Sequence, residues 1–98
     1  MRENPKHQYN AILFADIVGY TSLMQSDEQI ALGKLQSFKY HLESIAPNYQ
    51  GRIIQFYGDG CLVVFEGVVS ALSCAKELHL AFRKKMPFLS VSAYMLEK

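Results

Sequence analysis

The chain contains the stretch Phe14-Ala15-Asp16-Ile17-Val18-Gly19-Tyr20-Thr21, in which a run of apolar residues is followed by a carboxylate and a tight turn. The run begins at Ala11 and is typical of a buried strand. The carboxylate of Asp16 is costly at the end of such a strand unless a cation or a basic group meets it. The turn that follows can direct backbone N–H groups at phosphates, as strand-to-helix turns do. The octapeptide is therefore compatible with a metal and phosphate site, and equally with an Asp that caps the next helix or pairs with a surface base.

A second carboxylate lies between two apolar runs, in Gln55-Phe56-Tyr57-Gly58-Asp59-Gly60-Cys61-Leu62-Val63-Val64-Phe65. The Gly-Asp-Gly segment predicts a tight β-hairpin, in which an Asp is common for reasons of backbone conformation alone. If the hairpin lies beside the first strand, Asp16 and Asp59 face each other at one end of the sheet. Two carboxylates that close repel each other unless a divalent cation lies between them. Together the two stretches favour a metal site.

The spacing of apolar residues predicts four strands and two long helices. The expected strands are Tyr9–Ala15, Arg52–Tyr57, Cys61–Phe65 and a fourth in which Leu89, Val91, Ala93 and Met95 alternate with the residues between them. Apolar positions at helical spacing are Ala31, Leu35, Phe38, Leu42 and Ile45 in one helix and Val68, Leu72, Ala75, Leu78 and Phe82 in the other, with a short helical turn at Thr21–Gln25. The order β-α-β-β-α-β is that of a ferredoxin-like α+β sandwich.

Two local predictions concern side-chain placement. Ser26, with Gln29 three residues later, has the pattern of a helix N-cap with a capping box. Strict alternation along the strand Arg52–Tyr57 places Ile54 and Phe56 on one face and Gln55 on the other, together with Ile53 and Tyr57.

Composition sets limits on the class of protein. The chain has 98 residues, half of them hydrophobic, which suits one small domain with a buried core. We expect a disordered arm at residues 1–8 and a folded domain at residues 9–98. The net charge of +1 gives no electrostatic case for a nucleic-acid partner, and no apolar run approaches the roughly 20 residues that span a bilayer. Cys61 and Cys74 lie within apolar patterns and are expected to be buried, reduced thiols of a cytoplasmic protein.

Taken together, these motifs resemble the N-terminal half of the catalytic domain of the class III nucleotidyl cyclases, which are the adenylate and guanylate cyclases. The resemblance runs from about Asn10 to about Arg83, and it implies that residues 9–98 form a partial nucleotidyl cyclase catalytic domain. The residues that carry it are Phe14 to Thr21, Gly51-Arg52-Ile53-Ile54, Tyr57-Gly58-Asp59-Gly60 and Val63-Val64-Phe65. Both acidic motifs occur in the order and at the separation found in that family.

The resemblance implies a reaction and a set of site residues. The reaction converts a purine nucleoside triphosphate, with ATP favoured over GTP, to a cyclic nucleotide and pyrophosphate in intracellular signalling. Asp16 and Asp59 would be the catalytic acids that ligate two Mg²⁺ or Mn²⁺ ions, and the carbonyl of Ile17 would add a ligand to one of them. The predicted phosphate-binding residues are Val18, Gly19, Tyr20 and Thr21, and the position that reads the base is Gln55.

The chain departs from the family in ways that bear on activity. The adenylate cyclases usually carry a Lys at the position of Gln55, and a Gln can hydrogen-bond a purine but supplies no charge. The transition-state Asn and Arg of the family lie in its second half, and no Asn follows Asn48 here. We therefore expect a chain that is incomplete by itself and pairs with another cyclase domain as a homodimer or heterodimer. The alternatives are a non-catalytic module that binds a nucleotide or a partner domain, and a gene fragment.

Overall fold

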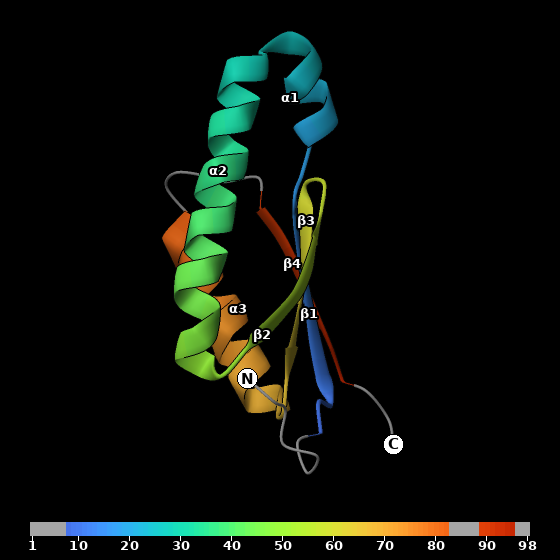
Figure 1. Ribbon diagram of the computed structural model, residues 1–98, viewed down its shortest axis with the longest axis vertical. Helices are drawn as coiled ribbons and strands as arrows, with labels where there is room; N and C mark the ends of the chain where they lie inside the picture. The colour runs from blue at the N-terminus through green and yellow to red at the C-terminus, as the bar shows by residue number, and fades with distance from the viewer. Residues whose placement is uncertain (1–7, 83–88, 96–98) are drawn as a thin grey trace.

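A four-stranded antiparallel sheet, with two long helices against one face, forms the body of the protein (Figure 1). The structure is a computed structural model that describes residues 8–82 and 89–95. Its strands are β1 (Ala11–Ile17), β2 (Arg52–Tyr57), β3 (Gly60–Phe65) and β4 (Leu89–Met95), in the order β2-β3-β1-β4. Its helices are α1 (Tyr20–Ser26), α2 (Glu28–Ile45), the 3-10 helix η1 (Ala46–Tyr49) and α3 (Val68–Phe82). The predicted ferredoxin-like α+β fold is confirmed, while residues 1–7 of the predicted arm lie outside the described residues.

The core lies between the sheet and the helices α2 and α3. Alternate residues of β1 point into it, because side chains of a strand alternate between the two faces. The predicted stripe of α2 is confirmed, with four of its residues buried and Leu35 packed at the margin of the core. The stripe of α3 is partly wrong, since Leu72 is 55% exposed and Ala71 and Cys74 are buried instead. Ala71, Cys74, Leu78 and Phe82 are spaced by three and four residues, so they form one continuous helix face that excludes Leu72.

The junction of α1 and α2 differs from the sequence prediction. The N-cap of α2 is Asp27, whose backbone is extended and whose carboxylate accepts a hydrogen bond from the N–H of Ile30 at 3.2 Å. Ser26 is the last residue of α1, and its hydroxyl donates to the carbonyl of Leu23 at 3.3 Å. Because α1 continues through Ser26, the first residue free to adopt a capping conformation is Asp27.

The edge strand β2 contains a β-bulge. Ile53 pairs with Val63 and Gln55 with Leu62, so Ile54 is the extra residue on the bulged strand. Ile53 and Phe56 consequently both contact the core, so the prediction that Ile53 shares a face with Gln55 and Tyr57 is wrong. Gln55 and Tyr57 lie on the face opposite Phe56, as predicted. A bulge redirects every side chain that follows it, and strict period-2 reasoning cannot anticipate it.

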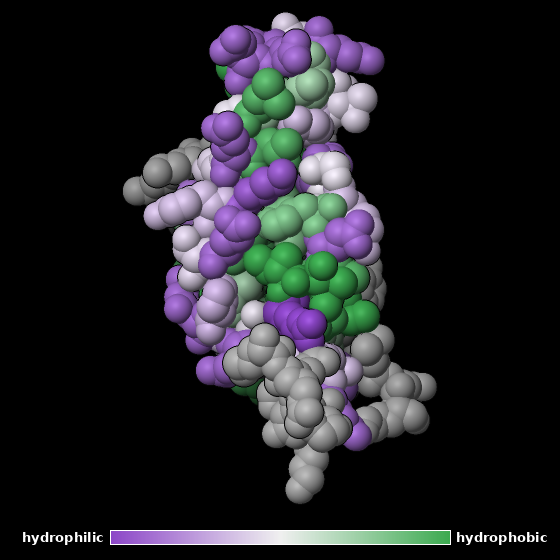
Figure 2. Space-filling model, in the orientation of Figure 1, coloured by the Kyte–Doolittle hydropathy of each residue, from purple (hydrophilic) through white to green (hydrophobic). Residues whose placement is uncertain are grey.

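The opposite face of the sheet is not covered by a helix in the part of the chain that the structure describes (Figure 1). Paired residues of antiparallel strands share a face, so Ile12 lies beside Val64 and Phe14 beside Leu62 on this side. We call this surface the open face. Figure 2 shows a hydrophobic area near the middle of the visible side, over β2, with hydrophilic residues around it. On β2, Ile54 is 47% exposed.

Candidate active site

The pairing of β1 with β3 brings the two predicted acids to one end of the sheet. Asp16 is opposite Gly60 in the β1–β3 register, and Asp59 immediately precedes Gly60 in the chain. The N–H of Ile17 also donates a hydrogen bond to the carbonyl of Asp59, with 3.1 Å between nitrogen and oxygen. The end of β1 is thus tied to the β2–β3 turn by backbone interactions on both sides of Asp16.

A pocket of about 500 Å³ opens at this end of the sheet. It is lined by Asp16, Ile17, Val18, Gly19, Tyr20, Thr21, Ser22 and Asp59. Every residue predicted to bind metal or phosphate therefore lines one pocket. Ser22 is the addition that the sequence reasoning missed. Its position in the first turn of α1, directly after the predicted phosphate loop, is the signal that could have found it.

Gly19 sets the path of the loop between β1 and α1. Its φ is +77°, in the left-handed region, and it occupies the N-cap position of α1 without a side-chain cap. A Cβ at this position would meet no atom within 4 Å, so the restriction comes from backbone conformation and not from crowding. A glycine reaches this conformation at little cost and lets the loop turn back over the end of β1.

Gly60, the residue of β3 opposite Asp16, places no side chain beside that carboxylate. A Cβ on Gly60 would lie 2.9 Å from Cζ of Phe14 and 3.5 Å from Cβ of Asp16. The Phe14 ring therefore lies over Gly60 on the open face, next to the acid. This placement agrees with a packing role for Phe14.

The donor set suits a hard divalent cation bound together with phosphates. Asp16 and Asp59 contribute carboxylates, and the loop contributes backbone groups, all of which are oxygen or N–H donors. No group of three or more His, Cys, Asp or Glu residues is arranged to hold a metal among residues 8–82 and 89–95. Mg²⁺ in nucleotide sites is commonly held by only one or two carboxylates, with substrate phosphates and water completing the coordination shell. The residues present fit a metal–nucleotide site better than a site made of protein ligands alone.

Gln55 does not line this pocket. Its register partner is Leu62, which lies beside Phe14 on the open face, so the bulge turns Gln55 to that face. Gln55 is exposed there, away from the pocket of its own chain. The structure thus brings the predicted metal and phosphate residues together and leaves the predicted base-reading residue on a neighbouring surface.

The two cysteines are buried and carry no disulfide. Burial raises the pKa of the Cys61 thiol from 9.0 to about 12, with smaller contributions from Glu43 and Cys74. Burial likewise raises the pKa of Cys74 to about 11. Neither cysteine lines the pocket, and a raised pKa keeps a thiol in its less nucleophilic, protonated form.

Fold and pocket together define an α+β domain in which two acids and the loop between β1 and α1 line one pocket at the end of the sheet. No family model matches the chain. The sequence is 40% identical over 81 residues to "Putative adenylate cyclase 3" of Rhizobium meliloti (strain 1021), a match that covers 82% of this chain and 14% of that protein.

Solved structures share the same fold. An adenylate cyclase of Trypanosoma brucei, studied in its monomeric state, superposes with a TM-score of 0.75 and 19% identity over 85% of this chain and 36% of its own. An adenylate/guanylate cyclase/hydrolase of Silicibacter pomeroyi superposes with a TM-score of 0.70 and 27% identity over 88% of this chain and 54% of its own.

The chain is a cyclase-like domain homologous to the adenylate and guanylate cyclases, and it corresponds to the N-terminal half of a class III nucleotidyl cyclase catalytic domain. It spans 14% of the length of the curated relative and about half or less of these two solved chains. Among the described helices, none has the length and apolar character needed to cross a membrane.

Proposed function

We propose that this chain supplies the metal- and phosphate-binding half of a nucleotidyl cyclase active site. The observation that carries the proposal is the pocket in which Asp16, Asp59 and the loop after β1 meet. In this role Asp16 and Asp59 hold two Mg²⁺ or Mn²⁺ ions, and the carbonyl of Ile17 adds an oxygen ligand. The backbone N–H groups of residues 18–21 bind the triphosphate.

The proposed reaction is attack of the ribose 3′ oxygen on the α-phosphorus. A new bond forms between that oxygen and the α-phosphorus, and the bond between the α-phosphorus and the oxygen that bridges to the β-phosphorus breaks. Pyrophosphate leaves with the electron pair of that bond and carries the proton that the 3′ hydroxyl loses. The bound ions supply Lewis-acid activation of the attacking oxygen and neutralise charge on the triphosphate. The contribution of the chain itself is to fix the positions of the phosphates. Asp16 is held by the pairing of β1 with β3, and the carbonyl of Asp59 accepts a hydrogen bond from the N–H of Ile17. Pyrophosphate and the cyclic nucleotide account for all atoms of the substrate.

The substrate assignment is a purine nucleoside triphosphate, with ATP preferred over GTP. The name of the curated relative, an adenylate cyclase, supports ATP. Gln55 can donate to and accept from a purine edge, but it brings no positive charge to the base. The intracellular pool of nucleoside triphosphates makes the cytoplasm the proposed compartment.

The proposed partner is another cyclase domain, in a homodimer or a heterodimer. Gln55 lies on the open face and not in the pocket, so a complete site requires groups from elsewhere. Apolar side chains such as Phe14 and Leu62 lie on the same face, and exposed apolar sheet surface favours association.

A second candidate function is a non-catalytic module that binds nucleotide or a partner domain. The uncharged Gln55 at the base-reading position favours it. This module would retain the metal site and the open face, and it would differ from the first candidate only in lacking turnover. A gene fragment without an independent role would bind neither.

Titration calorimetry with Mn²⁺, alone and with ATP, tests the proposed site. Asp16→Asn and Asp59→Asn remove a charge with little change in shape, so each is expected to weaken Mn²⁺ binding at least about tenfold, whereas Glu28→Gln, on the exposed start of α2, serves as the control. Wild-type protein is also expected to melt at a higher temperature with Mn²⁺ and ATP, by mass action. Equal Mn²⁺ affinity in the wild type and both Asp variants would remove the metal assignment.

A further inference from the structure

A second pocket lies between α1 and α2, beyond the end of the sheet. Helix α1 runs beside the first turns of α2 and contacts them (Figure 1). The pocket has a volume of about 350 Å³ and is lined by Val18, Gly19, Ser22, Leu23, Ser26 and Lys34. Sites for small molecules have volumes in this range. Since a water molecule takes up about 30 Å³ in the liquid, the pocket has room for about a dozen non-hydrogen atoms.

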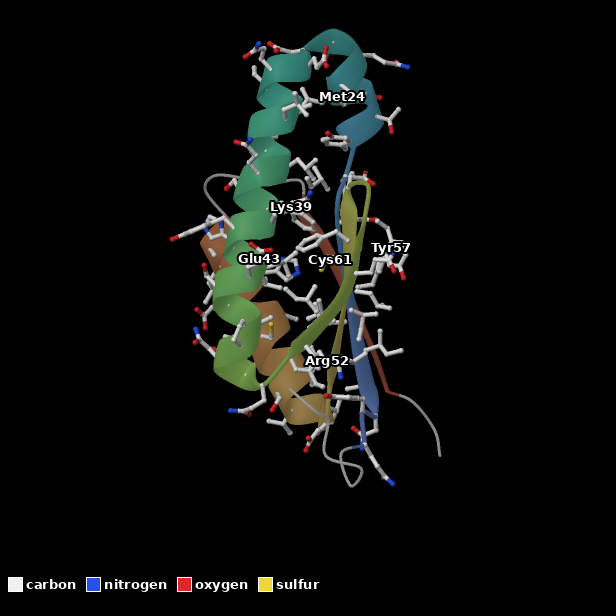
Figure 3. All side chains as sticks on the ribbon, viewed as in Figure 1. Met24, Lys39, Glu43, Arg52, Tyr57 and Cys61 are labelled. Carbon is white, nitrogen blue, oxygen red and sulfur yellow. The ribbon has the colours of Figure 1, made fainter. Side chains whose placement is uncertain are left out.

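The wall of this pocket combines apolar side chains with a lysine. Val18 and Leu23 supply the apolar surface, and Val18 is 55% exposed although it is aliphatic. Lys34 is partly buried, whereas Lys39 lies further along α2, at the level of the sheet, and is exposed (Figure 3). A partly buried lysine lays its stem along apolar surface and keeps its ammonium in contact with water. No carboxylate is among the described residues of the wall.

These groups define the kind of ligand that the pocket suits. An apolar wall favours an apolar body, and an ammonium at its edge favours a negatively charged head. Because the ammonium of Lys34 has three donors, it can hold a ligand carboxylate in addition to an interaction within the chain. The hydroxyl of Ser26 donates to the carbonyl of Leu23 at 3.3 Å, which leaves Ser22 as the hydroxyl that can also donate to the ligand. A singly charged carboxylate matches this arrangement.

The second pocket shares part of its wall with the candidate active site. Val18, Gly19 and Ser22 line both pockets, whereas Leu23 and Lys34 line only the second. A ligand between α1 and α2 therefore contacts the loop that is proposed to bind the phosphates, from outside the active-site pocket. Such a contact restricts the movement of the loop, and a loop that is fixed beforehand binds its ligand at a lower entropic cost.

We propose that the pocket between α1 and α2 binds a small amphipathic carboxylate, such as a medium-chain fatty acid, and that this ligand strengthens nucleotide binding. The carboxylate site is independent of the function proposed above, whereas its coupling to the nucleotide rests on that function. Coupling between two sites is reciprocal, so Mn²⁺-ATP must strengthen carboxylate binding by the same factor.

Titration calorimetry with octanoate, which has about ten non-hydrogen atoms, tests the site directly. Acetate has the charge without the chain and 1-octanol has the chain without the charge, so each is expected to bind at least about tenfold more weakly. Lys34→Met removes the charge and keeps most of the stem, and is expected to weaken octanoate binding about tenfold. The matched control is Lys39→Met on the same helix, because Lys39 does not line the pocket and its ammonium lies 5.4 Å from the centroid of the Phe56 ring.

The affinity for Mn²⁺-ATP measures the coupling. Saturating octanoate is expected to raise it about fivefold in the wild type and to leave it unchanged in Lys34→Met, which should match the wild type when octanoate is absent. Octanoate that fails to bind, or that binds the wild type and Lys34→Met equally, overturns the site. Octanoate binding without a change in Mn²⁺-ATP affinity overturns the coupling. A wild-type chain that binds octanoate but not Mn²⁺-ATP overturns the proposed function and the coupling, and supports the carboxylate site.

Discussion

The backbone N–H of Ile17 donates to the carbonyl of Asp59 over 3.1 Å, at the point where β1 leaves the sheet and the β2–β3 hairpin turns. This hydrogen bond joins the two segments that carry the acids, although they are far apart in the sequence. It fixes the loop after β1 against the turn, so the carboxylates of Asp16 and Asp59 reach the same pocket without help from a ligand. Preorganisation of this kind lowers the cost of binding a highly charged ligand.

Gly51 is expected to tolerate no side chain, in contrast to Gly33. A Cβ at Gly51 would lie 2.6 Å from the ring of Phe65, which is fully buried, and 3.1 Å from the carbonyl of Ala46. Gly51→Ala should therefore destabilise the fold by about 1–3 kcal/mol, as overpacking does. Gly33 lies within α2, and a Cβ added there would meet no atom within 4 Å, so Gly33→Ala should stabilise by about 0.5–1 kcal/mol.

Thermal unfolding of the two glycine variants checks this prediction. For a domain of this size, each kcal/mol corresponds to a shift of about 4–8 °C in Tm. Opposite signs of the two shifts are expected. A Gly51→Ala protein as stable as the wild type would show that the Phe65 ring can move aside.

The buried cysteines predict a loss of stability at alkaline pH. The pKa of Cys61 rises from 9.0 to about 12 and that of Cys74 to about 11, in both cases mainly through burial. Well below pH 9.0 both thiols are protonated in the folded and the unfolded chain. Above it the unfolded chain releases protons first, so stability falls as the pH rises toward the folded-state values.

Urea unfolding at neutral pH and at about pH 10 measures the effect of the cysteines. Other groups titrate in this range, so the informative quantity is the difference between the wild type and Cys61→Ala/Cys74→Ala. The double variant should be less stable at neutral pH because of the cavities it creates, but it should lose less stability on going to alkaline pH. An identical pH dependence of the two proteins would contradict the prediction.

The sequence allowed the element order and most of the core to be predicted, because hydrophobic periodicity is a local property. The errors have local physical causes too. The N-cap of α2 is Asp27 and not the predicted Ser26, because α1 extends further than its pattern indicates. Ile53 does not share a face with Gln55, because Ile54 forms a bulge between them. A bulge depends on how two strands pair, which composition does not encode.

The residues of the candidate site followed from motif chemistry, whereas their arrangement required the sheet. The sequence placed acids at two strand ends, but only the pairing of β1 with β3 shows that Asp16 and Asp59 share a pocket. Ser22 was missed because a hydroxyl in a helix has many ordinary explanations.

Association through the open face is expected in solution. Leu62 lies on this face beside Phe14, so Leu62→Lys should weaken association, because the charge would be buried at the interface. Val69→Lys is the control, since Val69 is 72% exposed on α3, on the helical side of the sheet. Sedimentation velocity over a range of concentrations measures the effect. A wild-type chain that stays monomeric at high concentration would argue against this interface.

Activity in a mixture of chains tests the central claim, that this chain supplies half of a cyclase site. Alone, with Mn²⁺ and ATP or GTP, it should form no appreciable cyclic nucleotide, because no Lys, Arg, Asn or Gln is among the described residues that line its pocket and loss of one electrostatic donor to the transition state costs about 10²–10³ in rate. Mixed with a complete cyclase chain whose own two metal acids have been replaced by Ala, it should restore cyclic nucleotide formation, and Asp16→Ala should abolish that restoration. Turnover by the isolated chain would contradict the claim that it supplies only half of the site. Absence of cyclic nucleotide from a mixture in which the two chains demonstrably pair would contradict the claim that it supplies the metal-binding half.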